Sequence, residues 1–126
     1  MPTPLHMASR GGHTNAMQLL IEAGADINVK NKRGWTLLHR ASYYNHINAI
    51  QLLIDVGADV NEKTNDGCIP LHIVSGWSHT AAIQLLINAG ANVNEKGGGG
   101  RTPLRYAAYN KHTDVIRLLE SYGAHM

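Results

Sequence analysis

Histidine is the residue type with the widest chemistry in this sequence, because imidazole binds metal ions and transfers protons near neutral pH. The chain has 8 histidines among 126 residues. Seven of them fall into two sets whose members are 33 residues apart: His6, His39 and His72, and then His13, His46, His79 and His112. Zinc needs ligand atoms about 2.0–2.1 Å from one ion, whereas equivalent residues of stacked helical units lie roughly 8–10 Å apart. The spacing therefore favours structural histidines, and we expect no metal and no cofactor.

Other residues offer little for catalysis. Cys68 is the only cysteine, and no acid or base motif accompanies it to lower its pKa. The run Gly97–Gly100 resembles a phosphate-binding loop only in composition, because it lacks the GxxxxGK[ST] pattern between a strand and a helix. We therefore expect no catalytic residue and no enzymatic activity.

The spacing of 33 extends through the whole chain and predicts an array of repeats. Each unit opens with a related tetrapeptide: TPLH at Thr3–His6, TLLH at Thr36–His39, IPLH at Ile69–His72 and TPLR at Thr102–Arg105. Three units continue with LLIEAGADIN, LLIDVGADVN or LLINAGANVN. These motifs resemble those of the ankyrin repeat family. The resemblance implies an all-α solenoid of four stacked helix-turn-helix units with β-hairpin loops. It also implies one domain, residues 1–126, with repeats at about 1–35, 36–68, 69–101 and 102–126.

The repeats must position two helices each. We expect first helices over 4–11, 37–44, 70–77 and 103–110, and second helices over 14–22, 47–55, 80–88 and 113–121. Thr36 suits a helix N-cap, and Gly57 suits the left-handed residue after a second helix. The loop Gly97–Gly100 lacks the polar side chains of its equivalents, so we expect it to be the least ordered of the loops.

Composition limits the cellular setting. The net charge is +2, a single cysteine cannot form an internal disulfide, and no apolar run approaches the ~18 residues of a membrane span. We expect a cytoplasmic or nucleocytoplasmic protein without a membrane segment. The first unit lacks a preceding hairpin and the last has a polar second helix, which suggests a fragment of a longer array and a C-terminal cap.

Aromatic residues are the candidates for binding. In the family, targets meet the hairpin tips and the exposed face of the first helices. The resemblance places five of the seven aromatic residues on that surface: Trp35, Tyr43, Tyr44, Trp77 and Tyr109. Tryptophan and tyrosine commonly anchor protein interfaces. The alternative is that these rings pack locally between neighbouring repeats.

Charge separates in the same way. The resemblance places the basic residues in hairpins on the concave side and the acidic residues on the outer second helices. The basic residues are Lys30, Lys32, Arg33, Lys63, Lys96 and Arg101, and the acidic ones are Glu22, Asp55, Asp114 and Glu120. We take Lys32, Arg33 and Arg101 as partner-binding residues and expect an acidic protein partner. Ordinary solvated charge is the alternative, and single-stranded nucleic acid is less favoured because no nucleic-acid-binding motif appears.

Three asparagines also repeat at this spacing. Asn28, Asn61 and Asn94 occur in an L…A[DN][IV]N context that resembles sites modified by an oxygen-sensing asparaginyl hydroxylase. A purely structural role, in which the amide ties the loop to backbone groups, explains the same residues.

The sequence thus indicates a non-enzymatic protein-interaction module, expected to be monomeric, with self-association through the concave face as an alternative. Two other interpretations stay open. One is a structural spacer within a longer array. The other is an engineered binder, which the departures from a uniform framework at Arg40, Val74, Ser75 and Thr113 make less attractive.

Overall fold

The structure is a computed structural model that describes the backbone of residues 14–126 and the side chains of residues 17–126. Within this range the chain forms seven α-helices and one short 3-10 helix. Their bounds are α2 (Thr14–Glu22), α3 (Leu37–Tyr43), α4 (Ile47–Asp55), α5 (Pro70–Gly76), α6 (Thr80–Asn88), η1 (Gly98–Gly100), α7 (Pro103–Tyr109) and α8 (Thr113–Ser121). The expected helix over 4–11 and the histidines His6 and His13 lie outside the described residues.

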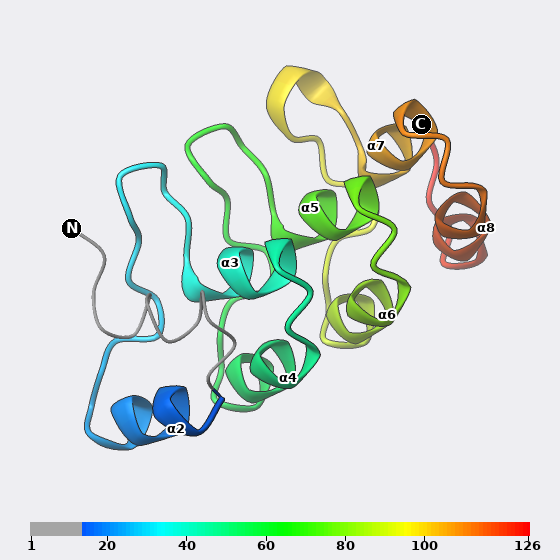
Figure 1. Ribbon diagram of the computed structural model, residues 1–126. Coiled ribbons are helices and arrows are strands. Elements are labelled where there is room, and N and C mark those ends of the chain that lie inside the picture. Colours follow the sequence, from blue (N-terminus) through cyan, green and yellow to red (C-terminus); the bar gives the residue numbers. More distant parts are fainter. Residues whose placement is uncertain (1–13) are drawn as a thin grey trace.

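The helices form two layers (Figure 1). The first helices α3, α5 and α7 pack side by side in one layer, and α2, α4 and α6 follow one another in the second. Long loops project beyond the first helices, toward the top of Figure 1. No described residue belongs to a β-strand, so the expected hairpins are hairpin-shaped loops closed by turns. The prediction of an all-α solenoid is confirmed. None of the described helices combines the length and the apolar character that a membrane span requires.

The second helices have the bounds that the sequence predicted, whereas each first helix ends one residue early. The reason lies in the residue two positions beyond the helix. Asn45, Ser78 and Lys111 adopt positive φ angles of 55°, 60° and 58°, a left-handed conformation that an α-helix cannot continue through. Tyr44 and Trp77 therefore cap the ends of α3 and α5 and do not form part of them.

Local hydrogen bonds fix where the first helices begin. The Thr36 hydroxyl accepts a bond from the His39 backbone N–H, and the Thr36 backbone N–H donates to His39 Nδ1 at 3.0 Å, which together form a capping box. The Thr102 hydroxyl accepts from the Arg105 backbone N–H at 3.3 Å. Ile69 has no hydroxyl, and there His72 Nδ1 still accepts the Ile69 backbone N–H at 3.0 Å. The capping role predicted for Thr36 is confirmed.

The core consists of equivalent residues from successive repeats. One row contains Leu53, Leu86 and Leu119, all with no solvent exposure. Similar rows run through the first helices, where Leu38, Leu71 and Leu104 are buried. Each repeat thus buries its apolar residues against the next repeat, so the two layers hold the projecting loops and the ends of the first helices in fixed positions.

The loop at Gly97–Gly100 lacks the side-chain bonds of its neighbours. In the first described loop, Asn31 Oδ1 accepts from the backbone N–H groups of Arg33 and Trp35, at 2.9 and 3.0 Å. In the next, the Thr64 hydroxyl performs the same role. Gly97 occupies the equivalent position and keeps only backbone bonds: its N–H donates to the Arg101 carbonyl at 2.8 Å, and its carbonyl accepts from the Gly100 N–H at 2.9 Å.

We therefore predict faster hydrogen exchange at Gly99 and Arg101 than at their equivalents Arg33 and Trp35. A lost hydrogen bond is worth about 1 kcal/mol, which corresponds to roughly fivefold faster exchange. Amide exchange measured by NMR and corrected for intrinsic rates tests this. Equal protection in the two loops would contradict it.

Candidate functional site

The histidines of the first set hold the loops to the first helices. His39 Nδ1 accepts the Thr36 N–H, so the proton of the neutral ring is on Nε2, which donates to the Cys68 carbonyl at 3.0 Å. His72 bonds in the same way to Ile69 and to the Glu95 carbonyl, the latter at 2.7 Å. The structural role that the spacing predicted for these histidines is confirmed by these bonds. Within the described part of the chain, no three His, Cys, Asp or Glu residues are grouped as a metal ion would require.

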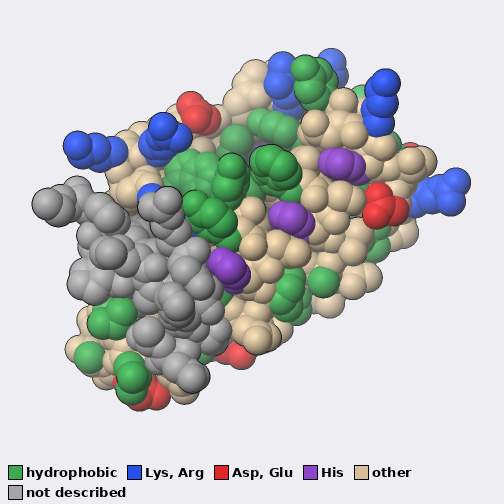
Figure 2. Space-filling view, viewed as in Figure 1, with side chains coloured by type: hydrophobic (Ala, Val, Ile, Leu, Met, Phe, Trp, Pro, Cys, Tyr) green, Lys and Arg blue, Asp and Glu red, His purple; other side chains and the backbone are tan. Residues whose placement is uncertain are grey.

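Two histidines of the second set, His79 and His112, link the start of a second helix to the end of the first helix in the previous repeat. His112 Nε2 donates to the Gly76 carbonyl at the end of α5, at 3.1 Å. Burial lowers the pKa of His79, and a hydrogen bond to the Tyr43 backbone at the end of α3 opposes that shift. Figure 2 shows histidine side chains in a row across the visible face. These residues fix the ends of the first helices, where the aromatic side chains lie.

We predict that the protein loses stability as the pH falls below about 6.5, the ordinary histidine value. Burial lowers the pKa of His39 and His72 in the folded state, so between the folded value and 6.5 the unfolded chain binds more protons. The contribution is complete above 6.5 and is lost as the pH falls through the folded pKa values. Urea unfolding at several pH values measures it. The variant His39→Gln should flatten the curve, whereas His125→Gln, at an exposed position, should leave it unchanged.

Four aromatic residues form a connected cluster, which we call the aromatic cluster: Trp35, Tyr43, Tyr44 and Trp77. Tyr43 is at its centre, with ring centroids 5.9 Å from Trp35, 5.1 Å from Tyr44 and 5.7 Å from Trp77, all edge to face. The Tyr44 ring also stacks on His46 at 5.9 Å. Tyr43, Tyr44 and Trp77 remain 41%, 39% and 55% exposed. The rings therefore pack on one another across repeats and still present surface to solvent.

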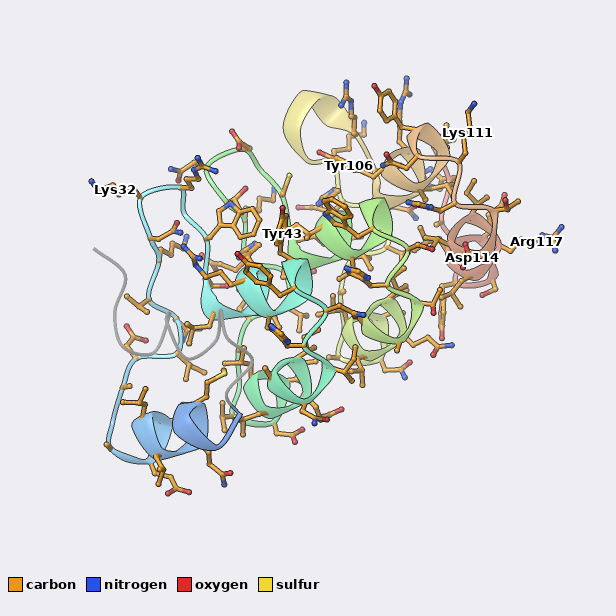
Figure 3. All side chains as sticks on the ribbon, in the orientation of Figure 1. Lys32, Tyr43, Tyr106, Lys111, Asp114 and Arg117 are labelled. Atoms are coloured by element: carbon orange, nitrogen blue, oxygen red, sulfur yellow. The ribbon has the colours of Figure 1, made fainter. Side chains whose placement is uncertain are left out.

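A cavity of about 340 Å³ lies beside this cluster, where α3, α5 and α7 meet the loops. We call it the groove pocket. Its lining residues are Trp35, Tyr43, Cys68, His72, Ile73, Gly76, Trp77, Tyr106 and Asn110. Figure 3 shows Tyr43 and Tyr106 on the side of the first helices from which the loops project. The walls are mainly rings and aliphatic carbon, so the pocket suits an apolar group.

Tyr106 is a lining residue that the sequence reasoning did not select. Its ring is held by His72, at a centroid distance of 5.4 Å, and by Cys68, whose sulfur lies 3.6 Å from the phenol oxygen. Burial raises the pKa of Tyr106 to about 12, and the bond to Cys68 adds to the shift. Ile73 lies 33 residues earlier, at the equivalent position of the previous repeat, and it also lines the pocket. This equivalence is the sequence signal that could have identified Tyr106.

Tyr109 stands apart from the other predicted residues. It is the last residue of α7, is 82% exposed and does not line the groove pocket. Of the five aromatic residues that the sequence selected, Trp35, Tyr43 and Trp77 line the pocket and Tyr44 packs on Tyr43. The structure thus brings four of the five together.

The basic residues divide into paired and unpaired groups. Lys30 forms an ion pair with Glu62, and Lys63 forms one with Glu95 at 2.8 Å, so these two lysines link neighbouring loops. A carboxylate faces each of these two lysines, which reduces their contribution to a basic surface. The exposed residues Lys32, Arg33 and Arg101 form no ion pair with any described residue.

The layer of first helices adds to this positive charge. Arg40 and Arg105 lie on α3 and α7, and no carboxylate occurs on α3, α5 or α7. Asp66 is the carboxylate at the tip of the middle loop. Figure 2 shows Lys and Arg side chains around the edges of the hydrophobic patch, and Figure 3 places Lys32 on the first described loop and Lys111 beside the end of α7. The acidic residues Glu22, Asp55, Asp114 and Glu120 lie on the second helices, as the sequence predicted.

The repeated asparagines connect successive loops. Asn61 donates to the Gly90 carbonyl at 3.1 Å and accepts from the Asn92 N–H at 2.8 Å. Asn94 makes the matching bonds to Gly123 and His125, at 3.3 and 2.9 Å. This geometry accounts for both residues structurally. Hydroxylation of Asn28, Asn61 or Asn94 stays a prediction, and a mass increase of one oxygen atom after incubation with such a hydroxylase would test it.

The chain is similar to known proteins at two levels. A family model described as "Ankyrin repeats (3 copies)" matches residues 1–64 and 56–126. Curated relatives include protein phosphatase 1 regulatory subunit 12A from mouse, human and rat, each 50% identical over 34 residues. That stretch is 27% of this chain and 3% of each relative, so the chain spans a small part of their length. Because the family model matches the chain from end to end, and its helix pairs stack in register, this protein belongs to the ankyrin repeat family.

Proposed function

We propose that this chain is a non-enzymatic protein-binding module that holds an acidic segment of a partner protein in the groove pocket and against the aromatic cluster. Ankyrin repeats are generally protein–protein interaction modules. The observation that carries the proposal for this chain is the exposure of large rings beside an open cavity. Trp77 is 55% exposed although it borders the groove pocket.

Exposed rings distinguish a binding surface from a spacer. A repeat that only stacks would bury its rings between neighbours, because clustered apolar surface in water is unfavourable. Here Tyr43 contacts both Tyr44 and Trp77, and all three rings still leave much of their surface open. Tryptophan and tyrosine bury large areas with few rotatable bonds, which makes them effective interface anchors. The spacer interpretation is therefore less well supported.

Charge supports an acidic partner. Lys32, Arg33 and Arg101 are exposed and unpaired among the described residues, and the first helices carry arginines without carboxylates. A surface of one sign attracts a partner of the opposite sign and raises the rate of association. Stacked repeats also fix the surface before binding, so little conformational entropy is lost. The short match to a phosphatase regulatory subunit fits a role in binding.

The test is partner capture by three forms of the chain at low and moderate salt. One is the wild type, one carries Lys32→Gln, Arg33→Gln and Arg101→Gln, and a matched control carries Glu22→Gln, Asp55→Gln and Glu120→Gln on the outer helices. Exposed charge pairs contribute about 0.2–1 kcal/mol each, so neutralising three cations should weaken capture roughly tenfold at low salt.

Salt and the control decide the result. The wild type should capture more partner than the variant that lacks the three cations, and this difference should shrink as the salt concentration rises, because salt screens the attraction of exposed charges. The outer-helix control should capture the same protein as the wild type. Equal capture by all three forms, with the fold intact, would rule out the acidic partner at this surface.

A further inference from the structure

The groove pocket lies where one repeat differs from its neighbours. The last residue of each described first helix is Tyr43 in α3, Gly76 in α5 and Tyr109 in α7. Gly76 lines the pocket, so the missing side chain contributes to the space. The pocket is therefore a gap in the row of side chains at the ends of the first helices.

The backbone does not require glycine at this position. Gly76 is absent from the residues with positive φ, and a Cβ built on it would meet Asn110 Nδ2 at 3.7 Å, an ordinary contact. Gly34 differs, because it has a φ of 76° and a Cβ there would lie 2.5 Å from Asn65 Oδ1. The fold therefore requires glycine at position 34, whereas position 76 has room for a side chain.

The walls of the gap are held in place from three repeats. Tyr43 of α3 contacts Trp77 at 5.7 Å on one side. Tyr106 of α7 is held on the other side by the bond to Cys68 at 3.6 Å and the edge contact with His72 at 5.4 Å. Because each ring is fixed by a neighbour, the gap persists without a ligand, and its faces remain available to an inserted group.

From this geometry we propose that the gap over Gly76 is a socket for one bulky apolar side chain, aromatic or large aliphatic, carried by an extended acidic segment of the partner. The inference rests on the proposed function and adds the chemistry of the anchoring residue. A volume of about 340 Å³ is at the low end of ligand pockets, about 300–1,000 Å³, which suits a side chain with adjoining backbone.

Cations lie on both sides of the socket, and their charge indicates which residues should flank the anchor in the partner segment. Lys32 and Arg33 lie at the tip of the loop before Trp35, and Arg101 and Arg105 lie before and on α7. A segment along the groove would pass both groups, so acidic residues on each side of the anchor find opposite charge. Asp66 is the single carboxylate at the intervening loop tip, which leaves the surface positive.

A displayed library of random short peptides, selected on the intact chain, tests the socket. We expect enrichment of peptides with one phenylalanine, tyrosine, tryptophan or leucine between aspartate and glutamate residues. The counter-selection uses Gly76→Tyr, which places in α5 the residue that α3 and α7 carry, so the fold should tolerate it. Gly76→Leu fills the same space if tyrosine disturbs folding, and Gly76→Ala is the matched control that leaves most of the gap open.

Synthetic peptides then give the size of the effect. An acidic peptide with a central phenylalanine should bind the wild type and Gly76→Ala at least tenfold more tightly than its alanine counterpart. On Gly76→Tyr that ratio should fall to about one. Both tryptophans of the chain line the socket, so intrinsic fluorescence should shift to shorter wavelength only when the phenylalanine enters.

Each of the other possible results would contradict the proposed socket. Acidic peptides that bind equally with phenylalanine or alanine would leave the groove a binding surface without an anchor, and the proposed function would stand. Enrichment of basic or sequence-independent peptides, or of none, would rule out an acidic segment as occupant. Concentration-dependent self-association that Gly76→Tyr abolishes would identify a second copy of this chain as the occupant.

Discussion

Replacing Tyr44 and Trp77 together with alanine is expected to weaken partner binding by about 2 kcal/mol or more, close to 30-fold in Kd. Both rings lie at the ends of first helices and remain 39% and 55% exposed. Trp77 also borders the groove pocket, and Tyr44 supports Tyr43 at 5.1 Å. The variant therefore removes a direct contact and also loosens Tyr43, the neighbouring ring on the same side of the pocket.

The fold should survive this change, because neither side chain belongs to the buried core. Thermal unfolding should show at most a small shift, since surface substitutions usually change stability by less than about 0.5 kcal/mol and partly exposed rings somewhat more. Calorimetric titration with the captured partner gives the affinity. Leu19→Ala is the control, because Leu19 is 67% exposed on α2, away from the first helices. Unchanged affinity of the folded double variant would end the assignment of these two residues.

Replacing Leu53 with alanine is expected to destabilise the protein by about 3 kcal/mol. Leu53 has no solvent exposure and belongs to the row that continues through Leu86 and Leu119. The substitution removes buried methyl groups and leaves a cavity between α4 and its neighbours. In a stacked array the loss also weakens the interfaces to the repeats on both sides.

Urea unfolding monitored by circular dichroism measures this effect, and Leu19→Ala is again the matched control. The same chemical change at an exposed leucine should alter the free energy of unfolding by less than about 0.5 kcal/mol. A similar small effect at Leu53 would show that the row of leucines does not carry the core.

Several features were predictable from sequence because local patterns specify them. The spacing of 33, the apolar stripes and the turn residues predicted both helix layers, and the bounds of the second helices are as predicted. The cap at Thr36 and the left-handed glycine at Gly57, with a φ of 92°, were also correctly predicted. Each depends on residues within one repeat, whose propensities and hydrogen bonds act over a few positions.

Contacts between repeats were harder to predict, because neighbouring loops and helix ends do not meet at identical repeat positions. Tyr43 contacts Trp77 and Lys30 pairs with Glu62, combinations that alignment of equivalent residues does not suggest. The lateral offset between repeats decided that Lys30 is neutralised, that Tyr109 lies apart from the pocket and that Tyr106 forms a wall.

The sequence by itself determined the stacked helix pairs, the structural use of the histidines and the side of the molecule on which the aromatic residues lie. Only the tertiary structure decided that an open pocket exists and that Gly76 leaves room for it. The physical reason is that a pocket is the space between side chains of three different repeats. Its presence depends on how those repeats are offset and how the rings are held, neither of which is encoded within a single 33-residue unit.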